Sequence, residues 1–322
     1  MRYIARRLIH CLILLLAISF FSFLLLQWAP GDFFNSLRLD PQVTPQTVSS
    51  LRAVYGLDQP LPVRYFRWVR SATNGDLGFS LAYNAPVGPL LWARARNTLL
   101  LTGSSTLLAW LLAVPIGIWS AACKDHLADR TIGLATGTLL TLPDLLLFLA
   151  LLLLALKTGW FPTGGMLSLQ AEEAGGFLDR AGSVALHLFL PALGLAIAGL
   201  PVLVRHVRSS MLEALKSPFI RAARGHGISQ RRLLFRYALP VAANPLISLF
   251  GLSLGTMLSA SLLVEVIMSW PGLGPLLLES ILSRDTYVVV GAITVSSVCL
   301  LVGNLLADVL LFVADPRIRV HP

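Results

Sequence analysis

Charge is scarce in this 322-residue chain. Only 13% of its residues are charged and 56% are hydrophobic, whereas soluble domains carry about 25% charged residues. A chain of this length would form about two soluble domains, and the sequence has too little charge to cover their surfaces. A mean hydropathy of +0.75 agrees with that deficit. The composition therefore excludes a soluble globular protein and indicates a protein that crosses the membrane several times.

Residues for several kinds of chemistry are also missing. The three cysteines lie far apart, which excludes a disulfide framework and a paired-cysteine metal site. None of the three lysines follows a glycine, so the phosphate loop of nucleotide hydrolases is absent. Neither H-E-x-x-H nor G-x-S-x-G occurs, and the histidines are scattered. We therefore expect no enzyme, cofactor or metal site on this chain, so uphill transport would need energy from a partner or an ion gradient.

Six apolar stretches are long enough to cross a membrane as helices, which takes about 20 residues each. Three arginines precede the first stretch, but its apolar run exceeds the roughly 7–15 residues of a signal peptide. We interpret it as an uncleaved span. The expected spans are Leu8–Ala29, Thr98–Trp119, Ile132–Leu156, Leu186–Val204, Leu246–Ile267 and Val288–Val313.

The basic residues gather on one side of these spans. The segments 1–7, 120–131, 205–245 and 314–322 hold 15 basic and 4 acidic residues, a net charge of +11. The segments on the other side hold 10 basic and 9 acidic residues, a net charge of +1. The positive-inside rule places the basic side in the cytoplasm. Both termini are therefore expected inside, and the basicity needs no nucleic-acid partner.

This topology divides the chain into three parts. Residues 1–29 are the basic lead and first span, 30–97 an extracytoplasmic segment, and 98–322 a core holding the other spans and the cytoplasmic loop 205–245. Within 30–97, Val63–Val69 mixes aromatic residues with arginines, which suits a helix lying near the membrane surface. A solvated connector with one short helix is the alternative. The outer loop 157–185 receives no role.

The loop 205–245 is the most informative segment. Ser217-Pro218 is a preferred helix start, and Gly225 and Gly227 are expected to stop that helix. Ser229 can cap a second helix, Gln230–Ala238, that leads into the fifth span. The expected contact surface of the first helix comprises Phe219, Ile220, Ala222 and Ala223, with Arg221 and Arg224 at its rim. Two interpretations stay open, docking to a protein partner and binding to anionic lipid.

The same loop resembles a known signature. Arg221-Ala222-Ala223, then Gly227, then Leu239-Pro240 have the spacing of the EAA signature of ABC-importer permeases. The resemblance implies that the loop forms a coupling helix, which sits in a groove of the cytoplasmic ATPase. Arg221 replaces the glutamate of the signature, as is usual in this branch. Gly225 and His226 stand where a helix former and a basic residue are expected, which puts the last turn of the helix in question.

Further matches run along nearly the whole chain and resemble the first permease subunit of dipeptide, oligopeptide and nickel importers. The resemblance implies a MetI-like core, a sister permease, two ATPases that bind ATP and Mg²⁺, and an extracytoplasmic binding protein, in a bacterial or archaeal cytoplasmic membrane. The implied function is passage of peptides, or of a nickel or metal chelate, by alternating access. The matches are Ala29–Asp32, Gly56–Pro62, Gly75–Gly78, Ser269–Gly274, Arg284-Asp285 and Asp315–Arg319.

Polar residues inside the spans are further candidates, because charge is costly at the bilayer centre. Pro143 should kink the third span, and Asp144 either lines the translocation path or satisfies backbone donors freed at the kink. Glu265 and Asp308 lie near span ends, where extension to the interface or pairing is expected.

The segment between the fifth and sixth spans should be a turn-rich hairpin. The resemblance implies that it faces the binding protein. Its candidate contact residues are Trp270, Pro271, Gly272 and Gly274.

Two other classes of protein compete with an importer permease. An ion-coupled secondary carrier would show inverted repeats and an acidic site in both halves, but Asp144 has no clear counterpart in the second half. A membrane enzyme or scaffold is disfavoured by the missing catalytic motifs.

The topology predicts a labelling pattern. In a cysteine-free background, a cysteine at Ser50 should react with an impermeant maleimide in intact cells, because 30–97 lies outside. A cysteine at Ser229 should react only after the membrane is opened. The reverse pattern would contradict the topology.

Overall fold

A computed structural model of the chain describes residues 2–28, 46, 50 and 59–314. The matches at Ala29–Asp32 and Asp315–Arg319 lie outside the described residues. Most of the segment 30–58 lies outside them as well. Nearly all of what is described is helical, so the prediction of an all-α membrane protein is confirmed.

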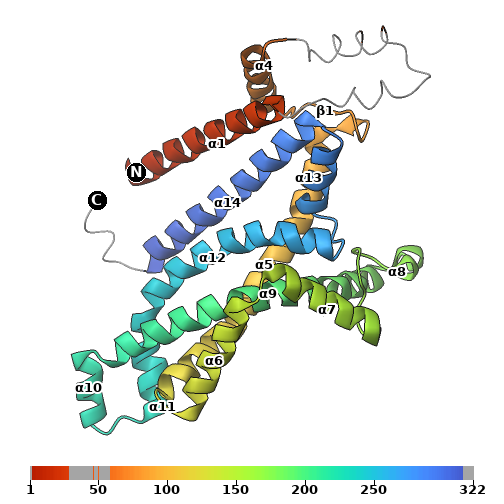
Figure 1. The fold of residues 1–322 in the computed structure, drawn as a ribbon. Helices are drawn as coiled ribbons and strands as arrows, with labels where there is room; N and C mark the ends of the chain where they lie inside the picture. Colours follow the sequence, from red (N-terminus) through yellow and green to blue (C-terminus); the bar gives the residue numbers. More distant parts are fainter. Residues whose placement is uncertain (1, 29–45, 47–49, 51–58, 315–322) are drawn as a thin grey trace. The chain divides into compact units, whose positions relative to one another are not determined.

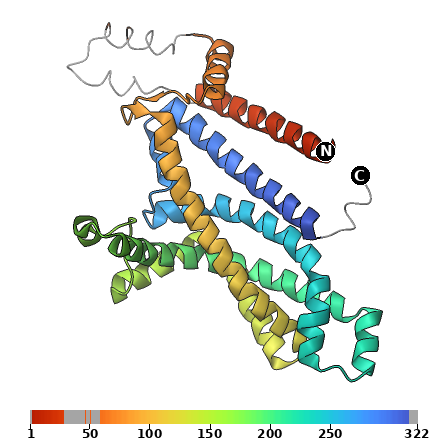
Figure 2. The same ribbon diagram turned by 180° about the vertical axis from the view of Figure 1, so that it is seen from behind.

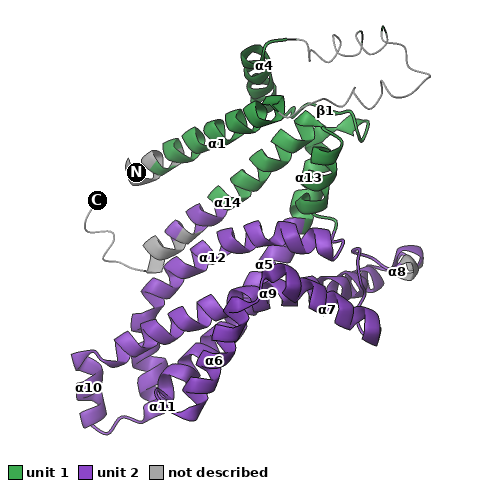
Figure 3. Ribbon diagram, viewed as in Figure 1, with its two compact units in different colours: residues 1–97, 271–301 green, residues 98–270, 302–322 purple. Residues whose placement is uncertain are grey.

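The chain folds into two compact units, coloured separately in Figure 3. Unit 1 contains residues 1–97 and 271–301, and unit 2 contains residues 98–270 and 302–322. Two long helices, α5 (Val87–Ala122) and α14 (Thr286–Ala314), contribute residues to both units. The domain boundary expected at residue 97 coincides with one of the unit boundaries.

Unit 1 is held by an aromatic cluster between α1 and α4. Phe23, Tyr65 and Trp68 are buried together, and Tyr65 Oη donates a hydrogen bond to the Leu16 carbonyl at 3.0 Å. The helix expected over Val63–Val69 exists, and its residues Tyr65 and Trp68 pack on α1, whereas Phe66 is exposed. Besides its parts of α5 and α14, unit 1 contains α1 (Arg2–Trp28), α4 (Leu61–Thr73), β1 (Phe79–Ser80), β2 (Ala85–Pro86) and α13 (Leu273–Leu282).

Unit 2 is organised around one central helix, α9, which packs against α6, α7 and α12. Its core includes Phe148, Leu195 and Trp270, all fully buried. Figure 1 shows the elements along the chain and Figure 2 gives the view from behind. The remaining elements are α6 (Leu127–Thr141), α7 (Asp144–Thr158), α8 (Leu169–Ala174), α9 (Phe177–Leu215), α10 (Pro218–Gly225), α11 (Gln230–Arg232), the π-helix η1 (Leu233–Ala238) and α12 (Leu239–Ile267).

Five of the described helical stretches are long and apolar enough to cross a membrane, and a sixth candidate is the bent pair α6 and α7. Four of the six expected spans lie entirely within these stretches, and the first and the sixth overlap Ile9–Trp28 and Thr286–Leu306 over most of their length. The helices are longer than the apolar runs, because they continue into polar sequence at their ends. The predicted loop residues 205–215, for example, are the last three turns of α9.

The third expected span, Ile132–Leu156, is two helices that meet at 99°. We expected a kink within one continuous helix, but the chain breaks into two separate helices. Leu142 is extended, with φ −81° and ψ 124°, because a residue before proline is driven out of the helical region. Pro143 has no N–H to donate, and α7 restarts at Asp144.

The segment 157–185, expected as an outer loop, contains the end of α7, all of α8 and the beginning of α9, and it packs against the end of α12. The Gly165 amide donates to the Ser269 carbonyl at 3.1 Å, and Phe161 and Met166 pack on the core of unit 2. A Cβ on Gly164 would lie 3.1 Å from the Ser269 side chain, so this approach favours glycine. The sequence alone assigned this loop no role.

Candidate functional site

The helix α10 follows directly on α9, separated by Lys216 and Ser217. It packs against the end of α9 and against η1, and Figures 1 and 2 show this corner from opposite sides. The helix expected over Pro218–Arg224 is therefore present as α10, and its coupling role stays a prediction. Proline at the first helical position fixes the φ angle that a helix needs.

Ser217 does not cap α10 with its side chain. Its hydroxyl donates to the Ala214 carbonyl at 2.6 Å, so it bonds back to the end of α9. Ser217 nevertheless stands at the N-cap position with an extended backbone, so the expected helix start at Ser217-Pro218 is confirmed. The bond instead closes the corner between α9 and α10.

The face that α10 exposes is not the contact surface that the sequence predicted. Ile220 is fully buried in a cluster that includes Met211 and Leu233, and Ala223 packs on the same cluster. These two residues are spaced by three, so they share one face of the helix, and that face is turned to the chain's own core. Phe219 is 47% exposed, and Ala222 is exposed as well.

The outward surface of α10 is therefore smaller than expected. It consists of Phe219 and Ala222, with the exposed Arg221 and Arg224 beside them. Including Ile220 in a partner contact was wrong, because its side chain is fully buried and attaches this short helix to the rest of the chain. Ala223 is half-buried, so its contact with a partner stays a prediction.

The exit from α10 follows the expected glycine. Gly227 has φ +77°, which glycine adopts without steric cost. The Ile228 amide reaches back to the Ala223 carbonyl at 3.4 Å, as in a Schellman ending. Gly225 is still helical, as the last residue of α10, so the turn out of the helix is made at Gly227 and not at Gly225.

The second expected helix, Gln230–Ala238, is interrupted. After α11 the chain forms a π-helix, η1, in which the Leu239 amide donates to the Leu234 carbonyl five residues earlier. Ser229 makes no side-chain capping bond. Pro240, in the first turn of α12, has no N–H for the regular ladder. Single π turns are frequent at functional sites.

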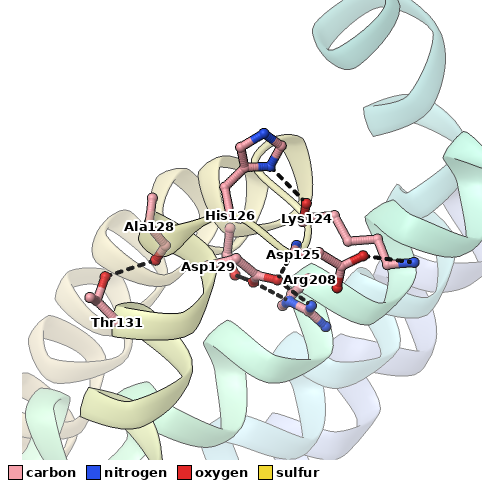
Figure 4. Close-up of polar contacts among 8 residues, drawn as sticks. Lys124, Asp125, His126, Ala128, Asp129, Thr131 and Arg208 are labelled. Atoms are coloured by element: carbon pink, nitrogen blue, oxygen red, sulfur yellow. Dashed lines mark hydrogen bonds and ion pairs between the residues drawn. The ribbon is translucent and has the colours of Figure 1, made fainter.

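An ion pair that the sequence did not suggest anchors the end of α9. Arg208 on α9 makes two bonds to Asp129 on α6, Nε to Oδ1 and Nη2 to Oδ2, each 2.7 Å long (Figure 4). The Asp129 side chain is 7% exposed and that of Arg208 is 33% exposed. A bidentate pair fixes direction as well as distance. The two residues are 79 positions apart, so no local pattern links them.

Asp129 also closes the turn between α5 and α6. It accepts hydrogen bonds from the Ser120 hydroxyl at 2.5 Å and from the Asp125 amide at 3.1 Å. Asp125 has φ +66°, a conformation that aspartate tolerates better than most residues. One carboxylate thus joins α5, α6 and α9, about two turns before the end of α9.

The proposed path residues lie at the break between α6 and α7. Asp144 is exposed and occupies the first turn of α7, where a helix favours negative charge. Its side chain makes no hydrogen bond to any part of the chain that the structure describes. The interpretation that it satisfies freed backbone donors is therefore not supported. Glu265 is fully buried, so of its two expected arrangements the extension to the interface was wrong, and pairing stays a prediction.

The outer segment after α12 is a helix, α13, and not a turn-rich hairpin. Trp270 is fully buried in the core of unit 2, and Gly272 and Gly274 are buried too. The surface contact expected of Trp270, Gly272 and Gly274 is therefore contradicted by their burial, whereas Pro271 is half-buried and its contact stays a prediction. The exposed part of the segment is at the end of α13, where Leu282 is most exposed.

The hairpin β1–β2 is tied to this outer segment within unit 1. The Ser80 hydroxyl donates to Asp285 at 2.7 Å, and Tyr83 hydrogen-bonds Glu279 of α13. Burial raises the pKa of Tyr83 to about 12, and the bond to Glu279 contributes to the same shift. The hydroxyl therefore keeps its proton at physiological pH.

No group of three or more His, Cys, Asp or Glu that could hold a metal ion occurs within residues 2–28, 46, 50 and 59–314. The site is thus a short exposed helix mounted on a bundle of long apolar helices. This arrangement fits the class of multi-pass transport permeases that the sequence motifs implied.

The family comparison agrees. The model of the "Binding-protein-dependent transport system inner membrane component" matches residues 113–320, and that of its N-terminal component matches residues 1–89. The chain therefore belongs to this family and is a transmembrane permease subunit of an ABC importer. This finding disfavours the ion-coupled carrier.

Several curated relatives match over nearly their whole length. The oligopeptide transport system permease protein AppB of Bacillus subtilis is 38% identical, covering 98% of this chain and 99% of AppB. OppB of Mycobacterium tuberculosis is 33% identical, and the dipeptide transport system permease protein DppB of Escherichia coli is 30% identical. Each of these two matches covers 99% of both chains.

A solved structure shares the fold. A chain of the inward-facing MetNI methionine ABC transporter aligns with a TM-score of 0.58 at 15% identity. The alignment covers 70% of this chain and 96% of that chain. The prediction of a MetI-like core is confirmed.

Removing the charge of Asp129 should weaken this anchor. In Asp129→Asn, Arg208 keeps its half-buried charge without a partner, and we expect the free energy of unfolding to fall by about 2 kcal/mol. The measurement is the Tm of the purified complex, together with substrate-stimulated ATPase activity, which should also fall.

Asp125→Asn is the matched control. Asp125 pairs with Lys124 at 3.6 Å, but both side chains are at least half exposed, and such pairs contribute little. Asparagine also tolerates the left-handed conformation. Equal losses in the two variants would contradict the role assigned to Asp129.

Proposed function

We propose that this permease and a sister permease form the channel of a peptide importer. Two ATPase subunits bind on the cytoplasmic side and an extracytoplasmic binding protein delivers the substrate. Three relatives, AppB, OppB and DppB, are named as oligopeptide or dipeptide permeases, which supports a peptide substrate. A nickel or metal chelate is the alternative that the sequence motifs leave open. The observation that carries the proposal is the exposed face of α10 on the anchored end of α9.

The proposed ATPase contact is the outward face of α10. Phe219 and Ala222 would be buried in a groove of the ATPase, and Arg221 and Arg224 would pair with acids at its rim. An apolar centre with a polar rim is the usual anatomy of an interface. ATP and Mg²⁺ bind to the partner subunits in this proposal, and this chain contributes no catalytic residue.

The inward face of α10 would transmit the motion of the ATPase. Ile220 fixes α10 to the buried cluster with α9 and η1, and the pair of Asp129 with Arg208 fixes α9 to the α5–α6 turn. Packed elements of this kind move together, because a close-packed core has few intermediate arrangements. A displacement of α10 would therefore tilt α9 and open or close the path on alternate sides.

The proposed path passes the break between α6 and α7. An exposed carboxylate beside a helix break attracts cations, so Asp144 would favour the amino group of a peptide or a metal cation. Both termini and the α10 corner are cytoplasmic in this proposal, because the basic residues gather on that side.

The function predicts a size effect on the outward face of α10. Ala222→Trp should prevent close docking, so pull-down of the ATPase subunits and transport should both fall at least 10-fold. Arg224→Glu should cost less, because ion pairs at a rim are typically worth under about 1 kcal/mol. Ala135→Trp adds the same bulk at an exposed site on α6 and should leave the ATPases bound.

If α10 binds lipid instead, the order reverses. Arg224→Glu would then dominate, and Ala222→Trp would be silent. An intact complex with Ala222→Trp would refute the docking of α10.

The path predicts a charge effect at Asp144. Asp144→Asn keeps the size and the hydrogen-bonding capacity but removes the charge, and transport of peptides with a free amino group should fall several-fold. Asp144→Glu restores the charge and should recover part of that transport. Transport and substrate-stimulated ATPase activity that are both unchanged in Asp144→Asn would exclude the role.

A further inference from the structure

A half-open cavity of about 420 Å³ lies beside the Asp129–Arg208 pair in unit 2. Its walls come from the end of α5, the first half of α6 and the later part of α9. The coupling proposal uses only the ion pair at its edge. The lining on which the argument depends comprises Arg130, Arg205, Arg208, Ile132, Gly133 and Val204.

The cavity carries an excess of positive charge. Asp129 is the one carboxylate among its lining residues, and it is already bonded to Arg208. Arg130 and Arg205 are exposed and form no ion pair within the part of the chain that the structure describes. Two guanidinium groups therefore remain to bind an anion, and guanidinium is well suited to phosphate.

The lining combines arginines with apolar residues, and Ser120 and Thr136 also line it. Arg130 and Arg205 belong to the basic segments 120–131 and 205–245, whereas Ile132 and Val204 are the first and last residues of their expected spans. In the expected topology the cavity therefore lies at the boundary between membrane and cytoplasm. A molecule with a phosphate at one end and hydrocarbon at the other matches such a lining, whereas a free anion would use only half of it.

We infer that this cavity binds the headgroup of an anionic phospholipid, with Arg130 and Arg205 holding the phosphate and the glycerol end resting on Ile132, Gly133 and Val204. Basic pockets between transmembrane helices on the cytoplasmic side are known to bind such headgroups. The inference rests on the cytoplasmic orientation of this end in the proposed function. The lipid would stabilise the same junction of α5, α6 and α9 that the ion pair holds.

The test is native mass spectrometry of the whole complex with added phosphatidylglycerol. In the double variant Arg130→Gln/Arg205→Gln, apparent affinity for phosphatidylglycerol should fall about 30-fold, because each basic residue near an anionic lipid contributes about a factor of five. The control double variant Arg231→Gln/Arg232→Gln removes two exposed arginines of α11, which share the basic segment 205–245 with Arg205 but lie outside the cavity. Its affinity should stay within about twofold of the wild type.

A second measurement needs no variant. A photoreactive phosphatidylglycerol should label wild-type peptides containing residues 130–136 or 204–208, and excess unlabelled phosphatidylglycerol should suppress that labelling.

Three results would overturn the inference. One is equal loss of lipid in the two double variants. Another is suppression of the labelling by millimolar inorganic phosphate, which would show a site for a free anion. The third is absence of lipid from the assembled complex, which would show that the sister permease covers the cavity. If the expected topology itself is wrong, a cysteine at Ser229 will react with the impermeant maleimide in intact cells, and that result does not depend on lipid binding.

Discussion

A buried carboxylate that must be neutralised is the constraint on which the α10 corner depends. Asp129 lies almost entirely out of solvent and receives hydrogen bonds from α9, from α5 and from the α5–α6 turn. An unpaired charge in that position would be strongly destabilising, so the three elements stay together only while Arg208 is in place. The end of α9 is fixed by that requirement, and α10 is mounted on the end of α9.

Proline gives the rest of unit 2 its bends, in two different ways. At Pro143 the chain leaves the helical region for one residue and turns by 99°, because α7 can restart without a partner for the missing donor. At Pro240 the helix continues, and the disturbance is taken up by the π turn of η1 just before it. The break at Pro143 exposes the carboxylate of Asp144. At Pro240 the helix is unbroken, so η1 connects the α10 corner directly to α12.

Hydropathy and charge predicted the spans, the short helix after α9 and its exit at Gly227, because these depend on local composition and backbone freedom. The contacts that define the site could not be predicted in this way. Asp129 and Arg208 are far apart in sequence, and each looks like an ordinary charge in a cytoplasmic loop. Ile220 and Trp270 looked like contact residues because apolar side chains near a surface are ambiguous until their own core is known. Pro143 predicted a bend but not its size.

The central claim is that the α5–α6 turn and α10 move as one body when the ATPases bind nucleotide. The most direct measurement is the distance between spin labels on cysteines at Lys124 and His226, which are both exposed, in the assembled importer with and without ATP. The account predicts one narrow distance distribution that does not change with nucleotide, while labels across the two permeases do move. A broad distribution, or a shift between the nucleotide states, would contradict it.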